Sequence, residues 1–475
     1  MKFQSILFGK ADAKEEGSTH PNLLINGYLD SLGITDAALN QSTFLFLGYK
    51  GSGKTALSEH IRLTANNYNS FVNDIQLIDF PYKSFSKVIS GASETEAKLP
   101  MAWEWLLLTY ALFSLSNDAS LNVENVDRWD ETLDAFKKLG IFPLKSIGDI
   151  VNKSTKKSFR MNVMNYLEFK TESEDSSIPQ DSFTHLVSFL KYILSNLYTP
   201  NKHYIIIDGL DEILLNKEIQ YKSIAALISQ AKDLNLFFRN NSLNIKLIIL
   251  CRTDIFERLP HPNKNKIRQD SSFSLNWFDE SNASDYRNCH LVRLANLRCK
   301  LACPDVDDMF SSFFPEKYHN QPTWQALLEY TRHTPRDFMQ LLNKIQRYTS
   351  GNIVTTNNIE QGLKNYSIDY FLPEIKDELV GYLDYSKIDL FFNLLSTLRK
   401  RDFTIHDIKN IKISNPIFAD LNVEEILAAM FECSAIGHLV GSDQRHCIKY
   451  RNRNMSFNPN EKILLHKGLW KALII

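Results

Sequence analysis

Residues 48–55 fit the spacing G-x-x-x-x-G-K-[ST], with a third glycine at position 51 and with Lys54 and Thr55 at its end. Glycines let successive backbone N–H groups point into one concavity, which can bind phosphate oxygens without side chains. We expect Lys54 to reach the β- and γ-phosphates of ATP and the Thr55 hydroxyl to coordinate Mg²⁺. The alternative is a glycine-rich turn that holds no ligand. The residues predicted to bind the nucleotide here are Gly48, Tyr49, Lys50, Gly51, Ser52, Gly53, Lys54, Thr55 and Ala56.

A second chemical group follows a run of isoleucines at residues 205–207, where three carboxylates occur at Asp208, Asp211 and Glu212. Because ligands collect at the carboxyl ends of buried parallel strands, we expect Asp208 beside the glycine-rich loop, where it can hold Mg²⁺. Hydrolysis of ATP also needs a group that orients or deprotonates water, and we assign this role first to Glu212 and second to Asp211. The alternative is an acidic loop at the start of a helix.

A third polar group ends the apolar segment 247–250, where Arg252 and Thr253 follow Cys251. A polar side chain at the tip of this strand would lie between the first two motifs and could sense the γ-phosphate. Arg252 is the candidate for this role. The alternatives are a surface arginine or an ion pair between Arg252 and Asp254.

These groups can meet only if a parallel sheet brings their strands side by side. Residues 43–47 predict the strand before the loop, and residues 56–63 keep apolar residues at helical spacing after it. Residues 75–80 predict a second strand, and the alternation at the end of residues 265–277 predicts a fifth one. The sequence therefore predicts an α/β fold with a five-stranded parallel sheet.

The motifs together resemble those of the signal-transduction ATPases with numerous domains (STAND), which are relatives of the AAA+ origin-recognition ATPases. The segments that carry the resemblance are "DGLDE" (208–212), "RTD" (252–254), "TPRD" (334–337) and "FGKADAKEE" (8–16). The resemblance implies a P-loop NTPase fold of the ASCE type, with Phe8 and Gly9 near the adenine and Arg336 contacting the nucleotide from a lid. Lys10 departs from the pattern, because these families have arginine there. The resemblance also makes Arg268 a candidate finger that reaches the next subunit of an oligomer, with a plain surface arginine as the alternative.

The rest of the chain predicts further units around this core. The stretch between the second strand and Asp208 far exceeds one crossover helix, so we interpret residues 84–198 as a helical insertion. We expect the ATPase core at residues 1–280, a helical lid at residues 281–372 and a winged-helix domain at residues 373–475. In the last unit, residues 379–399, "TIHDI" and "NVEEILAAMFECSAI" predict three helices, and "HCIKYRNRNMSF" predicts a β-hairpin.

Composition limits the partners. The chain has 475 residues, of which 54 are Lys or Arg and 55 are Asp or Glu. Its net charge is therefore close to zero and does not by itself attract nucleic acid or an anionic membrane. The apolar stretch 105–115 is too short to span a bilayer, and we expect a buried helix there. Six cysteines and no recognisable signal peptide at "MKFQSILFGK" indicate a cytoplasmic protein.

We consider two main interpretations of the function, which differ in whether the basic hairpin binds DNA. We expect an ATP-driven switch that recruits a separate effector protein or forms a homo-oligomer, and the STAND resemblance implies bacterial anti-phage defence as its setting. The alternative is a DNA-binding initiator- or loader-like ATPase. A small-molecule kinase is a third class, but it has no use for "DGLDE" or a winged helix. The residues that could contact DNA are Arg445, Lys449, Arg451 and Arg453.

Overall fold

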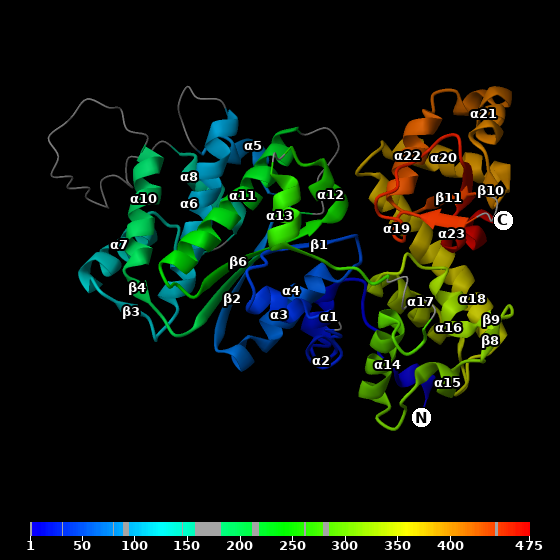
Figure 1. Cartoon of the computed structure of the whole chain (residues 1–475), viewed down its shortest axis with the longest axis horizontal. Coiled ribbons are helices and arrows are strands. Elements are labelled where there is room, and N and C mark those ends of the chain that lie inside the picture. Colours follow the sequence, from blue (N-terminus) through cyan, green and yellow to red (C-terminus); the bar gives the residue numbers. More distant parts are fainter. Residues whose placement is uncertain are drawn as a thin grey trace.

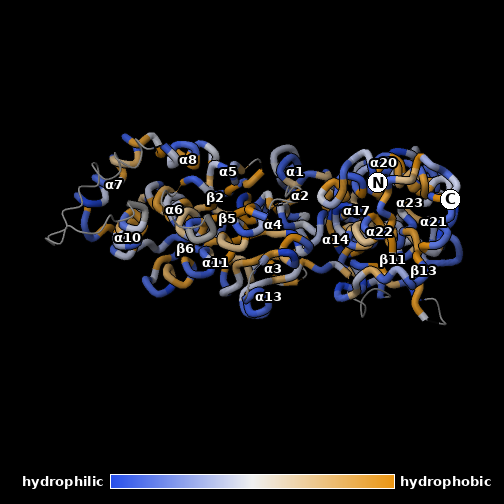
Figure 2. Tube along the Cα trace, turned by 90° about the horizontal axis from the view of Figure 1, so that it is seen from above, coloured by the Kyte–Doolittle hydropathy of each residue, from blue (hydrophilic) through white to orange (hydrophobic). Residues whose placement is uncertain are grey.

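The structure, a computed structural model, places a sheet-containing core at one end of the molecule and a second body of helices and short strands at the other (Figure 1). Viewed from above, the two bodies make an elongated molecule, with both chain ends in the second body (Figure 2). The residues that the structure describes are 2–30, 32–78, 80–88, 95–144, 146–156, 182–210, 218–260, 263–278, 285–441 and 445–475.

The core is built on a five-stranded sheet in which every pair of neighbouring strands is parallel, as predicted. Its strands, in spatial order, are β2 (Ser70–Gln76), β5 (Lys202–Asp208), β6 (Ile245–Arg252), β1 (Leu45–Gly48) and β7 (Ser272–Ser274). Gly48 pairs with Arg252 in the register of β1 and β6. The carboxyl ends of β1, β5 and β6 therefore meet at one edge, which is the arrangement that the three motifs require.

Alternation along the buried strands gives the sheet two apolar faces. Ile205 and Ile207 point to one face, where α6 (Thr95–Ser116) and α11 (Glu218–Asn240) cover them. Ile206 and Ile248 point to the other face, against α3 (Ile34–Leu39) and α4 (Lys54–Thr64). Helices on both faces explain why these strands read as continuous apolar runs.

The second strand lies earlier in the chain than the sequence suggested. Residues 75–80 were the prediction, but β2 ends at Gln76, and Phe80 N donates to Leu77 O in a turn. β2 is an edge strand with a largely half-buried surface, so its sequence SFVNDIQ lacks the apolar run that marks a central strand. The fifth strand was located correctly, although it is confined to β7 and follows a helix, α13 (Lys264–Ser271).

Helices fill the long connection between β2 and β5, as predicted. Trp103 in α6 donates from Nε1 to Ser223 O in α11, at 2.8 Å. Ser114 Oγ lies 2.8 Å from His203 Nδ1, which attaches the other end of α6 to β5, and neither residue has any exposed surface. The remaining elements of this region are α5 (Tyr82–Phe85), β3 (Asn122–Val123), α7 (Val126–Lys138), α8 (Ile147–Ser154), α10 (Ser182–Ser195) and β4 (Leu197–Tyr198).

In the described part of the chain, none of the helices combines the length and the apolar character that crossing a bilayer requires. The apolar stretch 105–115 lies inside α6, where Leu107 and Leu112 have no exposed surface, so it is a buried helix as expected.

The second body contains the predicted lid, which packs around the amino-terminal segment. Phe3 and Phe8 are fully buried in the same apolar cluster as Leu327 and Leu342. The helices and strands that make this layer are η1 (Phe3–Ser5), α14 (His290–Ala302), α15 (Met309–Phe313), β8 (Lys317–Tyr318), β9 (Gln321–Pro322), α16 (Thr323–Leu328), α17 (Pro335–Tyr348), α18 (Thr356–Tyr366) and η3 (Ser367–Phe371). The helices α1 (Ala13–Thr19) and α2 (Asn22–Ile25) connect it to the core.

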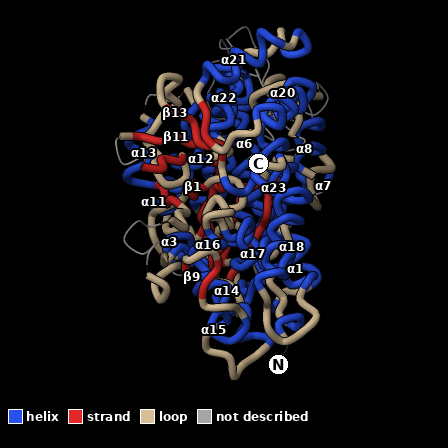
Figure 3. Tube along the Cα trace, turned by 90° about the vertical axis from the view of Figure 1, so that its right-hand side faces the viewer, coloured by secondary structure: helices blue, strands red, loops and turns tan. Residues whose placement is uncertain are grey.

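A winged helix lies on top of the lid (Figure 3). It is entered through α19 (Leu372–Leu379), and a four-stranded sheet of order β10-β13-β11-β12 accompanies its helices. Its other elements are α20 (Tyr385–Leu398), β10 (Asp402–Phe403), α21 (Ile405–Ser414), η4 (Pro416–Phe418), α22 (Val423–Glu432), β11 (Ile436–Val440), β12 (Arg445–Ile448), β13 (Lys462–Leu465) and α23 (Lys467–Leu473).

Two predictions for this domain need correction. The first helix begins at Tyr385, because residues 380–384 form a turn after α19. The hairpin is made by β11 and β12, whereas most of the predicted hairpin, residues 449–457, is turn and loop. Asn452 and Asn454 lie in this stretch, and asparagine favours turns because its side chain bonds to the nearby backbone.

His466 gives the contact between winged helix and lid a dependence on pH. Its ring stacks on Phe371, with the ring centroids 4.8 Å apart, and only 1% of the residue is exposed. Burial, together with the nearby charge of Arg332, lowers the pKa of His466 to about 3. The folded protein therefore keeps this ring neutral in mild acid, whereas an unfolded histidine takes up a proton below about pH 6.5.

The free energy of unfolding should consequently be highest above about pH 6.5 and fall as the pH falls below it. From this group alone we expect a loss of about 1 kcal/mol between pH 7.5 and pH 5.5, measured by urea denaturation. The variant His466→Asn keeps a side chain that can cap α23, where His466 Nδ1 accepts from Gly468 N, and should show a smaller loss. The same pH dependence in both proteins would contradict the assignment.

Candidate nucleotide-binding site

The glycine-rich loop between β1 and α4 has the backbone of a phosphate site. Gly51 and Gly53 adopt positive φ values of 82° and 93°, which only glycine adopts readily. Lys54, the first residue of α4, is 4% exposed, and its Nζ donates to Gly48 O at 3.2 Å and to Tyr49 O at 3.3 Å. Its ammonium group therefore lies over the loop, where a bound phosphate would attract it.

The predicted Mg²⁺ ligands lie within hydrogen-bond distance of each other. Thr55 Oγ1 donates to Asp208 Oδ2 at 2.8 Å, although 153 residues separate them in the chain. Asp208 is the last residue of β5, and its other carboxylate oxygen accepts from Gly209 N at 2.8 Å. A hydroxyl and a carboxylate are the oxygen ligands that Mg²⁺ prefers, so this pair fits the ion.

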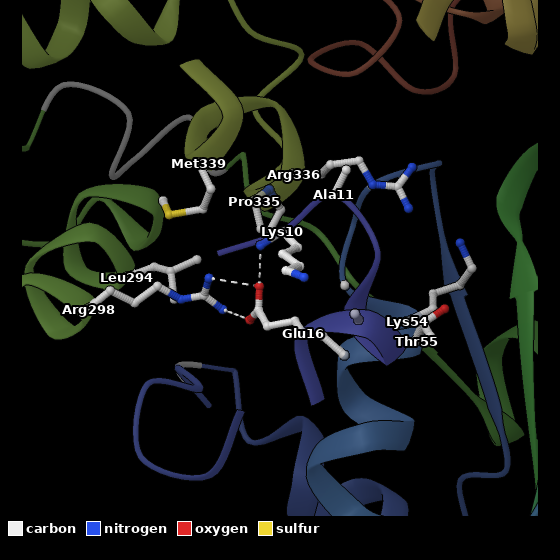
Figure 4. A pocket seen from close by; sticks show the side chains of 14 residues that line it. Lys10, Ala11, Glu16, Lys54, Thr55, Leu294, Arg298, Pro335, Arg336 and Met339 are labelled. Atoms are coloured by element: carbon white, nitrogen blue, oxygen red, sulfur yellow. Dashed lines mark hydrogen bonds and ion pairs between the residues drawn. The ribbon is translucent and has the colours of Figure 1, made fainter. Parts of the chain in front are cut away.

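A pocket with a cavity volume of about 80 Å³ lies beside the loop, between the core and the lid, and is partly open to solvent (Figure 4). Each of three parts of the chain supplies one wall. The loop contributes Gly51, Gly53, Lys54, Thr55 and Ala56; the amino-terminal segment contributes Lys10, Ala11, Ala13 and Glu16; the lid contributes Leu294, Arg298, Pro335, Arg336 and Met339. Its mixture of apolar and cationic side chains suits a ligand with a flat apolar part and an anionic part.

A buried ion pair forms the wall away from the loop. Arg298 Nη2 donates to Glu16 Oε1 at 2.7 Å, and Lys10 N donates to Glu16 Oε2 at 2.6 Å. Phe8 lies in the lid cluster and offers its carbonyl oxygen to Arg298, while Gly9 O accepts from Asn343 Nδ2 at 2.8 Å. Phe8 and Gly9 thus hold the segment that lines the pocket, and their contact with adenine stays a prediction.

Arg336 enters the pocket from the start of α17. Thr334 caps this helix by accepting from Asp337 N at 3.2 Å, and Pro335 occupies its first position, which places Arg336 in the first turn. Arg336 N donates to Gly51 O at 3.3 Å, so the lid touches the loop directly. In Figure 4 the guanidinium of Arg336 points away from Glu16 and Arg298. Its Nη1 donates to Glu374 Oε1 at 3.2 Å.

Arg252 lies at the tip of β6, beside Gly48, and its role as a sensor of the γ-phosphate stays a prediction. It makes the ion pair with Asp254 that was the alternative, with Nη2 2.8 Å from Asp254 Oδ2, and only 8% of its side chain is exposed. Nη2 also lies 3.5 Å from Glu378 Oε1 of α19. Tyr382 OH donates to the same Asp254 oxygen at 3.0 Å. The pair is therefore part of a buried network rather than a surface contact.

Arg268, the predicted finger, lies away from the pocket. Arg268 in α13 pairs with Glu257 of α12 (Thr253–Arg258), and 39% of its side chain is exposed. Asp211 and Glu212 lie outside the described residues. Their assignment stays a prediction from the sequence.

The basic segment of the winged helix contacts the core. Arg453 lies over the ring of Tyr49 in the glycine-rich loop, at 5.7 Å, and Arg451 lies over Phe278 at 5.5 Å. Burial raises the pKa of Tyr49 to about 12, although the charge of Arg453 opposes this. Lys449 pairs with Glu432 at 3.1 Å, whereas Arg445 is exposed. Lys449, Arg451 and Arg453, three of the candidates for contacting DNA, are therefore engaged in contacts within the chain.

Several contacts of the site had no signal in the sequence. Glu16 and Arg298 pair across 282 positions, and Glu374 meets Lys50 and Arg336 from a helix that no motif marks. Acidic residues on the exposed face of a helix are common, so the type of residue alone does not identify such contacts. The one signal in the sequence was the spacing of Glu374 and Glu378, which places both carboxylates on the same face of a helix.

Comparison with known proteins gives three findings. Residues 290–372 match the family model described as "FunZ-associated C-terminal helical domain", and this stretch runs from the start of α14 to the first residue of α19. No match was found among curated proteins. Among solved structures, the chain is similar to the crystal structure of Cdc6p from Pyrobaculum aerophilum, with 10% sequence identity over 98% of this chain and 96% of that chain, and a TM-score of 0.33.

Proposed function

We propose that the protein is an ATP-binding and ATP-hydrolysing molecular switch of the AAA+ or STAND type. The observation that supports this most directly is the pocket, which joins the glycine-rich loop of the core to Arg336 of the lid. A nucleotide bound there would contact both bodies of the molecule at once. Its phosphates could therefore bias the position of the lid and of the winged helix behind it.

Each step of the proposed chemistry has a residue to perform it. Lys54 would bind the β- and γ-phosphates, and Thr55 with Asp208 would hold Mg²⁺, which supplies charge neutralisation at the transferring phosphoryl group. Glu212, with Asp211 as second choice, would orient the attacking water. Arg336 would contact the nucleotide from the lid.

The same site could serve two kinds of output. Recruitment of an effector protein or assembly of a homo-oligomer, with anti-phage defence as the setting, follows from the STAND resemblance. A DNA-binding loader is the second candidate. The contacts of Arg451 and Arg453 with the core favour the switch, because these side chains are engaged inside the chain. DNA binding would require them to leave those contacts.

The switch predicts that ATP and ADP have different effects on the second body. Only a ligand that interacts differently with two states can shift the equilibrium between them, and the γ-phosphate is the group that distinguishes ATP from ADP. We therefore expect hydrogen exchange over residues 285–475 to differ between the ATP and ADP complexes. Arg336→Ala should remove this difference while the glycine-rich loop still binds nucleotide.

Arg347→Ala is the matched control, because Arg347 lies at the exposed far end of the same helix. It should preserve the difference between ATP and ADP. Identical exchange in both complexes of the wild-type protein would refute the switch. Salt-sensitive DNA binding that disappears when Arg445, Lys449, Arg451 and Arg453 are neutralised would support the loader instead.

A further inference from the structure

Helix α19 carries two glutamates that bridge the core and the lid. Glu374 Oε1 lies 3.1 Å from Lys50 Nζ in the glycine-rich loop and 3.2 Å from Arg336 Nη1 in the lid. A single carboxylate oxygen is thus shared by two cations from different parts of the molecule. Only 14% of the Glu374 side chain is exposed. The bridge lies at the point where the lid continues into the winged helix.

Glu378 repeats this arrangement one helical turn further on. Its Oε2 lies 2.6 Å from Arg332 Nη1 of the lid, and its Oε1 lies 3.5 Å from Arg252 Nη2 at the tip of β6. This glutamate is more deeply buried, with 5% of the side chain exposed. Residues four apart lie on one face of a helix, so a single face of α19 presents both carboxylates to core and lid.

The cations held by Glu374 are the ones that a nucleotide phosphate would attract. Lys50 belongs to the glycine-rich loop, and Arg336 lines the pocket. Burial would by itself raise the pKa of Glu374, but the charges of Lys50, Arg332 and Arg336 lower it below its usual value, so the group is a carboxylate at neutral pH. A carboxylate and a phosphate compete for the same N–H donors of lysine and arginine.

We propose that Glu374 sets the discrimination between ATP and ADP, because it holds Lys50 and Arg336 until a γ-phosphate competes for them. This inference rests on the function proposed above. ADP has no γ-phosphate and leaves the bridge intact. In the ATP complex, the γ-phosphate takes the place of the Glu374 carboxylate beside Lys50 and Arg336. Helix α19 then loses its attachment to Lys50 of the core. Glu378 is a second attachment, through Arg252, and it remains in place when the first is broken.

The test is the ratio of the dissociation constants for ADP and ATP in Glu374→Gln. Glutamine keeps the shape of the side chain but removes the charge that competes with the γ-phosphate. We expect the ratio of the ADP dissociation constant to the ATP dissociation constant to be about tenfold higher than in the wild-type protein. A hydrogen bond to a charged group contributes a binding free energy of about that size. In an Arg336→Ala, Lys50→Ala background the same substitution should leave the ratio unchanged, because the cations it frees are absent.

Glu329→Gln is the matched control. Glu329 also lies at the junction of the lid and the winged helix, where it pairs with Lys467, but its ion pair involves neither Lys50 nor Arg336. It should leave the ratio at the wild-type value. An unchanged ratio in Glu374→Gln, in a protein whose wild type binds both nucleotides through Lys54, would overturn this inference and leave the proposed function standing. A wild-type protein with no Lys54-dependent binding of either nucleotide would instead reject the proposed function.

A measurement on the wild-type protein keeps the inference open to test if Glu374→Gln fails to fold. Hydrogen exchange of residues 372–379 should be faster in the ATP complex than in the ADP complex, because the bridge to Lys50 and Arg336 is broken only by ATP. Equal exchange of this segment in the two complexes would overturn the inference, even if other parts of the lid respond to the nucleotide.

Discussion

Replacement of Lys54 with alanine is expected to abolish binding of Mg·ATP while the chain remains folded. Among the described residues, the Nζ of Lys54 donates to two carbonyl oxygens, both of them in the loop. A charged hydrogen bond to phosphate is stronger than these, and we expect the dissociation constant to rise by about a hundredfold or more. Isothermal titration calorimetry with ATP and with ADP measures the effect directly.

Lys202→Ala provides the control for this variant. Lys202 is the first residue of β5, at the end of the sheet opposite the loop, and its Nζ donates to Asn40 Oδ1 at 2.9 Å. This substitution removes the same charge without touching the pocket, so ATP affinity should stay at the wild-type value. The two variants should also have similar thermal midpoints. Unchanged ATP affinity in Lys54→Ala would reject the phosphate-binding interpretation of the loop.

The second large effect is expected on turnover. Glu212→Gln keeps the size of the side chain but removes the carboxylate that would orient water, whereas Lys54, Thr55 and Asp208 are unchanged. We expect hydrolysis to fall by roughly 10²- to 10⁴-fold, the range for loss of a general base, with little change in ATP affinity. Release of phosphate under single-turnover conditions, together with a binding titration, separates the two quantities.

Asp211→Asn is the comparison that decides between the two candidate acids. The neighbouring carboxylate is removed in the same way, so any general effect of lost charge in this segment should appear in both variants. If Asp211→Asn alone blocks hydrolysis and Glu212→Gln does not, the water-orienting role belongs to Asp211. Full activity in both variants would mean that neither carboxylate orients the water.

The sequence was sufficient for the elements whose signals are local. The loop 48–56, the strand that precedes it and the isoleucine run before Asp208 are contiguous patterns, and backbone preference and burial act on them directly. The pairing of Thr55 with Asp208 was also foreseeable, because the carboxyl ends of parallel strands share one edge of the sheet. The edge strand β2 was misplaced, because its half-exposed surface carries no apolar run.

Only the tertiary structure decided which charges meet across the core, the lid and the winged helix. Arg252 has the residue type and strand-tip position of a phosphate sensor, yet it pairs with Asp254 and approaches Glu378. Lys50 meets Glu374 although 324 positions separate them in the chain. Such contacts depend on how separately folded units pack against one another, and a buried charge takes whichever partner that packing supplies. The sequence by itself therefore determined the glycine-rich loop and the pairing of Thr55 with Asp208, because these follow from contiguous patterns and from the shared edge of the sheet. The packing of α19 against the core and lid determined which cations its glutamates hold.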